Sequence, residues 1–290
     1  MFAGTGTALI TPFKKDGSVD EEALRRLVNF QEENGVNMLI PCGSTGESAM
    51  LNHQEHLKVI SIVRDEAKKA MVIAGAGSNC TSEAIILSRD AQDLGVDGLL
   101  SISPYYVKPT QEGIYQHYKA IAESVDTPII LYNVPGRTGS NISVDTVLRL
   151  SELDGIAAIK EASGNLNQVQ SILSRRPEGF DVLSGDDGMT YAMMALGADG
   201  VISVASNCCP GLVSEMVRSA SSENYDIARG IHDKLLPLFG GLFCESNPIP
   251  IKYVMSVMGY GTASPRLPLT ALSENGRKVL DPMLRDLGIA

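Results

Sequence analysis

Residues 20–41 of the 290-residue chain read DEEALRRLVNFQEENGVNMLIP, and this stretch predicts a helix followed directly by a strand. Apolar side chains recur at helical spacing through residues 20–34, at Leu24, Leu27 and Val28. Gly35 is a typical helix stop, and the apolar run at residues 38–41 has the length of a buried strand. A helix joined to a strand in this way is typical of repeated βα units and a parallel sheet.

The same alternation of short apolar runs and charged helical stretches continues along most of the chain. Eight runs are predicted as strands, at residues 7–10, 38–41, 71–74, 98–102, 129–132, 156–160, 181–183 and 200–204. Eight βα units in about 220 residues match the closed (β/α)8 or TIM barrel of the α/β class. A doubly wound sheet usually has fewer strands and a glycine fingerprint after its first strand, whereas Gly4-Thr5-Gly6 precedes the first predicted strand.

After residue 204 the pattern changes to helices alone. Residues 224–238, 250–258 and 273–287 all have helical character, and no further strand is predicted among them. We therefore predict a catalytic barrel over residues 1–222 and a C-terminal helical region over residues 223–290.

Composition excludes several classes of protein. Hydrophobic residues make up 44% of the chain and charged ones 20%, as in folded globular proteins rather than disordered ones. The net charge of −10 opposes nucleic-acid binding. The sequence shows neither a signal peptide nor an apolar run of roughly 18 residues, so we expect no membrane partner and a cytoplasmic location. The five cysteines form no C-x-x-C pair and are expected to be reduced thiols.

In a βα barrel the functional residues lie on the loops after the strands. The loop at residues 43–47, GSTGE, is small and glycine-flanked, which suits it to hold an anion as well as to form a tight turn. Lys160 ends the sixth strand, where burial lowers the pKa of an amine and makes it a nucleophile toward carbonyls, unless the side chain extends into water.

Two neighbours strengthen the interpretation of Lys160 as a nucleophile. The phenol of Tyr132, one strand away, can shuttle protons during carbinolamine formation, although a packed core tyrosine is equally common. Arg137, in the loop after the same strand, suits capture of a substrate carboxylate, the alternative being a surface ion pair.

Together, five stretches resemble the dihydrodipicolinate synthase family of class I pyruvate aldolases over essentially the whole chain. They are GSTGE at 43–47, PYY at 104–106, YNVPGRT at 132–138, IKEA at 159–162 and NPIPIK at 247–252. The loop, the tyrosine and the lysine are shared by several lyases of the superfamily, including N-acetylneuraminate lyase. Arg137 and Thr138 resemble the synthase in particular. Ser44 departs from the family's usual threonine, and it keeps the hydroxyl but loses the stiffening methyl group.

The resemblance implies a reaction and a set of roles. Lys160 forms a Schiff base with pyruvate, and the derived enamine attacks L-aspartate 4-semialdehyde to give 4-hydroxy-tetrahydrodipicolinate in the diaminopimelate route to lysine. No metal and no organic cofactor is implied. The implied proton relay is Tyr132, Ser44 and Tyr106; the substrate-binding residues are Ser44 and Thr45 for the pyruvate carboxylate, Arg137 for the aldehyde's carboxylate, and Gly185 and Ile202 as pocket lining.

Assembly and regulation are implied in the same way. The Tyr106 position of the family reaches into a neighbouring subunit, which predicts a homo-oligomer, usually a dimer of dimers. Feedback inhibition by lysine is predicted from positions that resemble the lysine site of inhibited members: Ser48, Ala49, His53, His56, Asn79, Glu83 and Tyr105. Residues 52–56 alternatively form nothing more than an N-capped helix start.

Three other functions remain open from the residues alone. The first is another class I pyruvate lyase or aldolase that acts on a different aldehyde. The second is a metal-dependent class II aldolase or amidohydrolase, suggested by His53, His56 and Asp186-Asp187 but lacking a third nitrogen or sulfur ligand nearby. The third is a non-catalytic barrel that binds a small acid, for which Lys160 and Tyr132 would be superfluous.

Overall fold

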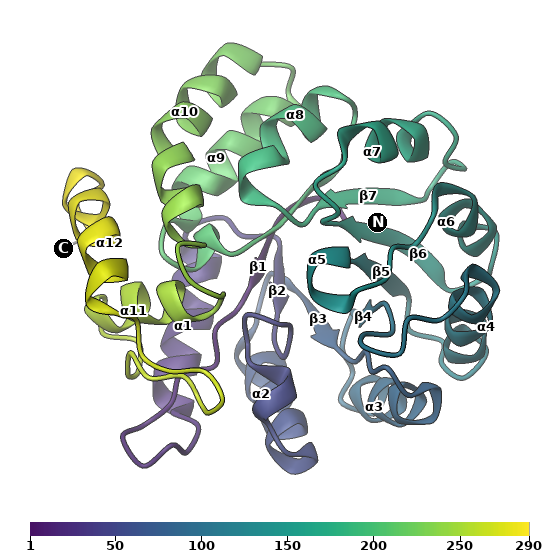
Figure 1. Ribbon diagram of the computed structural model, residues 1–290, viewed down its shortest axis with the longest axis horizontal. Coiled ribbons are helices and arrows are strands. Elements are labelled where there is room, and N and C mark those ends of the chain that lie inside the picture. Colours follow the sequence, from purple (N-terminus) through teal and green to yellow (C-terminus); the bar gives the residue numbers. More distant parts are fainter. Residues whose placement is uncertain (290) are drawn as a thin grey trace.

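The computed structural model describes residues 1–289, and in it eight parallel strands close into a barrel in chain order (Figure 1). The strands are β1 (Gly4–Ala8), β2 (Met38–Ile40), β3 (Met71–Gly75), β4 (Gly98–Ile102), β5 (Ile129–Asn133), β6 (Ile156–Glu161), β7 (Asp181–Ser184) and β8 (Gly200–Ser203). The ring is completed by pairing of β1 with β8. The predicted (β/α)8 barrel is confirmed.

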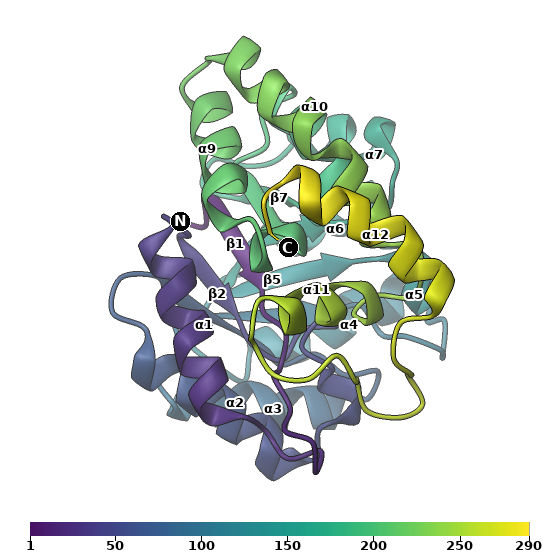
Figure 2. The same ribbon diagram turned by 90° about the vertical axis from the view of Figure 1, so that its left-hand side faces the viewer.

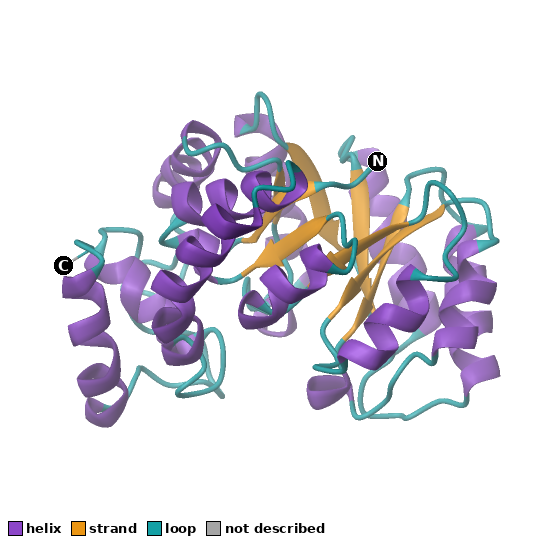
Figure 3. Ribbon diagram, turned by 90° about the horizontal axis from the view of Figure 1, so that it is seen from above, coloured by secondary structure: helices purple, strands orange, loops and turns teal. Residues whose placement is uncertain are grey.

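Helices surround the strands, so that the sheet forms the centre and the helices the outside (Figure 3). They are α1 (Glu21–Glu33), α2 (His53–Glu66), α3 (Thr81–Asp93), α4 (Gln111–Ala122), α6 (Val144–Ser151), α7 (Leu166–Leu173), α8 (Thr190–Ala195) and α9 (Pro210–Ser221). Four short helices lie in the loops after strands: η1 (Ser48–Met50), α5 (Pro135–Thr138), η2 (Asp187–Met189) and η3 (Ala205–Asn207).

The helix and strand at residues 20–41 form as predicted. The Asp20 side chain accepts the Ala23 N–H and caps α1, whose buried face includes Leu24 and Leu27. Gly35 follows the helix with φ of 80°, a left-handed conformation that glycine adopts without a steric penalty.

Side chains alternate along the strands between two separate apolar cores. On β5, Ile129 and Leu131 pack outward against the helices, whereas Ile130 and Tyr132 belong to the core inside the barrel. Ala158 on β6 belongs to the inner core as well, and Lys160 lies two residues further along. The two-residue period of a strand therefore places Tyr132 and Lys160 on the inner face of the barrel.

The first strand was predicted wrongly. It spans Gly4–Ala8 instead of residues 7–10, so Gly4-Thr5-Gly6 lies within the strand and not before it. Glycine disfavours strands in general, but here the barrel interior requires it. A Cβ atom on Gly6 would lie 2.9 Å from Ile40 Cδ1 and 3.3 Å from the Val201 carbonyl oxygen, so a side chain at this position would have to displace residues of the inner core.

The C-terminal region adds α10 (Tyr225–Gly241), α11 (Ile249–Val257) and α12 (Glu274–Asp286). In Figure 2, α11 and α12 lie on one side of the barrel, with α10 above them. The predicted helical extension is confirmed, while the division at residue 222 stays a prediction. None of the helices in residues 1–289 combines the length and the apolar character that a bilayer span requires.

Candidate active site

Lys160 and Tyr132 meet inside the barrel. The two residues are register partners on β6 and β5, and Lys160 Nζ lies 4.4 Å from the centre of the Tyr132 ring. Both side chains are buried, with residue exposures of 5% and 7%. The sequence prediction that these two groups converge at the ends of neighbouring strands agrees with this geometry.

Burial sets the charge state of both groups. It lowers the pKa of Lys160 to about 7, an effect that Asp187 opposes and the positive charge of Arg137 reinforces. Burial raises the pKa of the Tyr132 phenol, while the Arg137 guanidinium and the Ser44 hydroxyl act in the opposite direction. Near neutral pH a large fraction of the lysine is therefore the free amine, and the phenol keeps its proton. An amine nucleophile thus lies next to a proton donor.

The loop at residues 43–47 borders the same space. Ser44 and Thr45 line a cavity of about 130 Å³ together with Lys160, Tyr132 and Arg137. Thr45 Oγ1 accepts a hydrogen bond of 3.0 Å from the Asn247 side-chain amide, which fixes the loop from the C-terminal region. Backbone N–H groups in such a turn are suited to an anion.

Arg137 lies in the single turn α5 at the mouth of this cavity. Its guanidinium donates to the Asn247 carbonyl oxygen at 3.1 Å. Opposite, Gly185 lines the cavity wall after β7, and a Cβ atom there would lie 3.0 Å from Lys160 Cε and 2.7 Å from Ala162 Cβ. The absence of a side chain at Gly185 leaves room for the lysine.

Two of the candidate residues lie away from this cavity within one chain. Tyr106 is 87% exposed, has a left-handed φ of 71°, and donates its backbone N–H to the Thr138 carbonyl at 3.0 Å. That position is compatible with the prediction that Tyr106 serves a neighbouring subunit. Ile202 belongs to the apolar core inside the barrel, and Val204 lines the cavity from the same end of β8.

A larger cavity of about 500 Å³ adjoins the first one and shares Ser44, Tyr132, Arg137 and Asn247 with it. Six of the residues predicted to bind lysine line it: Ser48, Ala49, His53, His56, Glu83 and Tyr105. Asn79 is not among its lining residues, but its amide donates to the Tyr105 carbonyl at 3.1 Å. The structure therefore brings the predicted set together beside the Lys160 cavity.

The two histidines of that cavity have separate partners. His53 Nε2 lies 2.8 Å from Asp90, and His56 Nε2 donates to the Gly75 carbonyl at 2.7 Å. Across residues 1–289, no group of three or more His, Cys, Asp or Glu side chains has an arrangement that would hold a metal ion.

Comparison with known proteins assigns the chain to a family. The model of the dihydrodipicolinate synthetase family matches residues 1–287. The chain belongs to this family. The 4-hydroxy-tetrahydrodipicolinate synthase of Chloroherpeton thalassium is 53% identical over 289 residues, which cover 99% of this chain and 96% of that one.

Solved structures of family members have the same fold. The chloride-inhibited dihydrodipicolinate synthase of Acinetobacter baumannii, complexed with pyruvate, is 45% identical with a TM-score of 0.98 over 100% of both chains. The enzyme of Cyanidioschyzon merolae with lysine bound is 39% identical with a TM-score of 0.97, covering 100% of this chain and 99% of that one. The resemblance inferred from the sequence is confirmed at the level of the family.

Two further residues of this family member lie at the site: Asn247 was given no role from the sequence, and Asp187 was named there only as a candidate ligand of a metal-dependent enzyme. Asn247 lines both cavities, and its Oδ1 atom is buried without a hydrogen-bond partner in the described chain. Asp187 is buried near Lys160, and its Oδ2 accepts the N–H groups of Val204 and Ala205 at 3.0 and 2.9 Å. Asn247 is the first residue of the NPIPIK motif, and this motif is the sequence feature that could have pointed to it.

Proposed function

We propose that this chain is a lyase that condenses pyruvate with L-aspartate 4-semialdehyde to 4-hydroxy-tetrahydrodipicolinate through a Schiff base on Lys160. One observation supports this proposal above the others: a buried amine with a pKa lowered to about 7 lies against a phenol in a cavity that an arginine and a glycine-rich loop also line. Membership of the family agrees with it.

The steps balance without a cofactor. The Lys160 amine adds to the C2 ketone of pyruvate, and the carbinolamine loses water to give an iminium. Loss of a methyl proton forms the enamine, whose terminal carbon adds to the aldehyde carbon of the second substrate. The new C–C bond replaces the C=O π bond, the oxygen takes up a proton to become an alcohol, and the enamine returns to an iminium. The substrate's own amine then adds to the iminium carbon, and departure of Lys160 closes the ring and frees the enzyme.

Each role on the protein side has a stated physical basis. Tyr132 supplies and accepts protons because its phenol stays protonated and lies against the amine. The backbone N–H groups of Ser44 and Thr45 hold the pyruvate carboxylate, while the Ser44 hydroxyl continues the relay toward Tyr106. Serine keeps the donor and acceptor of the family's usual threonine, so we expect the relay to work.

Arg137 binds the carboxylate of the aldehyde substrate. Its guanidinium faces both cavities and makes its protein hydrogen bond to a neutral backbone carbonyl, that of Asn247. A guanidinium with donors to spare is suited to bidentate carboxylate binding. Gly185 leaves space for Lys160, and Ile202 packs in the core inside the barrel without lining the cavity.

Assembly and inhibition by lysine are part of this proposal. The exposed Tyr106 would complete the relay of a partner subunit, so the active form is a homo-oligomer, with a dimer of dimers expected. Lysine would bind in the larger cavity, where Glu83 can accept its ammonium group. Activity that stays flat across a lysine titration would contradict the inhibition. The cytoplasmic location stays a prediction.

The deciding experiment measures turnover of pyruvate with L-aspartate 4-semialdehyde, coupled to the reductase that consumes the product, with chelator present throughout. Turnover would establish the substrate pair and independence from free metal. Borohydride reduction with pyruvate, followed by mass spectrometry, should place the adduct on Lys160. An adduct without turnover would favour the alternative, a pyruvate lyase for another aldehyde, and the absence of any adduct would contradict the Schiff base.

A further inference from the structure

A fully buried ion pair connects the 43–47 loop to the C-terminal region. The ammonium of Lys252 on α11 contacts the Glu47 carboxylate, and both side chains have zero exposure. Lys252 also donates to the Thr11 carbonyl at 3.0 Å, and the second Glu47 oxygen accepts the backbone N–H of Arg266 at 2.8 Å. Both charges are thus hydrogen-bonded on several sides, as buried ions must be.

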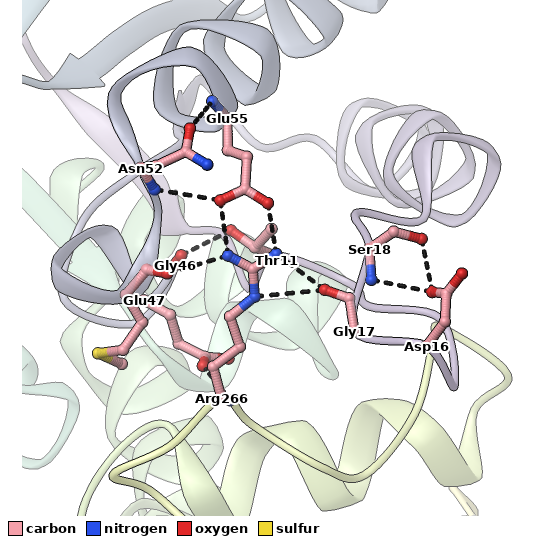
Figure 4. Close-up of polar contacts among 10 residues, drawn as sticks. Thr11, Asp16, Gly17, Ser18, Gly46, Glu47, Asn52, Glu55 and Arg266 are labelled. Carbon is pink, nitrogen blue, oxygen red and sulfur yellow. Dashed lines mark hydrogen bonds and ion pairs between the residues drawn. The ribbon is translucent and has the colours of Figure 1, made fainter.

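Arg266 extends the pair into a network, and Figure 4 draws the contacts around Arg266 and Glu55. Its guanidinium donates to both carboxylate oxygens of Glu55 at 2.6 and 2.7 Å, and it reaches the carbonyls of Gly17 and Met50 at 2.8 and 2.9 Å. This contact is the main reason that the pKa of Glu55 falls to about 2. The ring of Phe13 lies below both cations, 3.9 Å from the Lys252 ammonium and 4.5 Å from the Arg266 guanidinium.

The loop that this network holds has an unfavourable backbone. Cys42 directly precedes it and Glu47 is its last residue, and both have left-handed φ values, of 56° and 59°, which cost energy in residues other than glycine. Such conformations persist only where the surroundings determine them. At Glu47 the side chain supplies that determination, because its carboxylate is fixed by groups on the C-terminal region.

A buried ion pair contributes little to stability compared with an apolar pair of the same volume. The pair instead fixes the orientation of the Glu47 side chain, because its carboxylate has to face Lys252 and Arg266 for its charge to be compensated. Neither Lys252 nor Arg266 lines either of the two cavities described above, so neither touches the substrates. Lys252 and Arg266 can affect the reaction only through neighbouring residues that line the cavities, and Glu47, which lines the larger one, accepts hydrogen bonds from both.

We propose that the Glu47–Lys252 pair, with Arg266, is a positioning device that fixes the 43–47 loop so that Ser44 and Thr45 face Lys160. The inference rests on the proposed function, since it concerns the loop that holds the pyruvate carboxylate. It makes the C-terminal helical region a structural part of the active site. Lys252, Glu47 and Arg266 are positioning residues in this proposal.

The test compares the parent chain with Glu47→Gln, Lys252→Met and the variant that carries both changes. Each single change leaves one buried charge without its partner, so a single variant can fail to fold for that reason alone. The double variant removes both charges at similar volume, so neither charge is left buried without its partner. Positioning can therefore be measured in it separately from folding.

In the double variant we expect a melting temperature close to that of the parent, and a KM for pyruvate raised by about tenfold or more with a smaller change in kcat. Amide hydrogen exchange at residues 43–47 should be faster than in the parent. A folded double variant with unchanged KM and unchanged exchange would overturn the proposal. A parent chain without turnover would contradict the proposed function instead, and the exchange measurement would still decide the positioning role.

A milder pair of variants covers the case in which the double variant does not fold. Arg266→Gln is matched by Arg176→Gln, because both arginines pair with a carboxylate and two carbonyls, and their side-chain exposures are 22% and 23%. Arg176 lies before β7, at the opposite end of the barrel. We expect both variants to lose thermal stability, but only Arg266→Gln to raise the KM for pyruvate, by several fold. An equal KM in the two variants would overturn the proposal.

Discussion

The two ends of the barrel use polar side chains in opposite ways. At the amino ends of the strands, three residues that directly precede β2, β4 and β8 accept backbone N–H groups of the neighbouring strand. Asn37 accepts from Thr5 at 2.9 Å, Asp97 from Val72 at 2.8 Å, and Asp199 from Val182 at 2.7 Å. These side chains close the barrel by completing the hydrogen bonding of its strand ends.

At the carboxyl ends the polar groups face a cavity instead. The Lys160 amine lies against the Tyr132 ring, and Asn247 Oδ1 is buried without a partner among residues 1–289. Because Asn247 lines both cavities, this oxygen is available to a substrate, whereas the buried Thr5 hydroxyl, which also lacks a partner within residues 1–289, lies at the amino ends and lines neither cavity. The comparison teaches that one end of this barrel is arranged for stability and the other for chemistry, as in other βα barrels.

Of the changes considered, removal of the Lys160 amine should cause the largest loss of activity. In Lys160→Met we expect kcat/KM to fall by about 10⁴-fold or more, because no Schiff base can form. The borohydride adduct with pyruvate should disappear as well. Thermal stability near neutral pH should rise, because the folded chain no longer has to bury an amine whose pKa is lowered. A variant that is inactive and less stable would contradict the division of labour between the two ends.

The second prediction tests whether Tyr106 acts in the active site of a partner subunit. Tyr106→Phe should lower kcat by about 10²-fold, within the range of a lost proton relay. Mixing it with Lys160→Met under subunit exchange should restore activity in about a quarter of the sites, since random pairing gives some dimers one intact site. If Tyr106 acts within its own chain, mixing will restore nothing.

A substitution at Gly185, in the cavity wall at the same end, should have a smaller effect on activity. Gly185→Ala places a methyl group 3.0 Å from Lys160 Cε and 2.7 Å from Ala162 Cβ, closer than van der Waals contact allows, so the lysine side chain has to shift. A displacement on the order of 1 Å can cost about 10²-fold in rate, and we expect a loss of about 10-fold to 10²-fold in kcat/KM. The same substitution at Gly230, where nothing lies within 4 Å of an added Cβ atom, is the control. Equal activity in the two variants would remove Gly185 from the wall around Lys160.

The pH dependence follows from the pKa of Lys160, which burial lowers to about 7. Only the free amine attacks pyruvate, so the rate of imine formation should fall about tenfold for each pH unit below 7 and level off above it. Stopped-flow reaction with pyruvate, followed by borohydride trapping, measures this rate. A rate profile with its midpoint near pH 10.5, the ordinary pKa of lysine, would show that the amine is not desolvated in solution.

The sequence predicted the parts of this protein that depend on local pattern. Seven strands begin at the predicted residue because apolar runs mark them, whereas β1 was misplaced because its glycines carry no apolar signal. Lys160, Tyr132 and Arg137 were predicted to converge because neighbouring strands end at one face of a barrel. Their geometry agrees, and their roles stay predictions.

Other features depend on contacts that no local pattern encodes. The hydrogen bond from Asn247 to Thr45 spans 202 residues of sequence, and the Glu47–Lys252 pair spans 205. Both arise from the way in which the C-terminal region docks on the barrel, which has no period to detect. The proposed partner of Tyr106 lies in another chain, and no pattern within this chain can reveal it.

The smallest expected effect belongs to the closing end of the barrel. Asp97→Ala removes the acceptor for the Val72 N–H, and we expect a loss of about 1 kcal/mol in the free energy of unfolding, because the Asp97 side chain is 37% exposed and water can partly replace it. Chemical denaturation measures this loss, and kcat/KM per folded site should stay at the parent value. Asp97 directly precedes β4, the strand that leads to residues 103–106. A changed kcat/KM would therefore mean that strain at the amino end is transmitted through β4 to the active site, and that the two ends of the barrel are not independent.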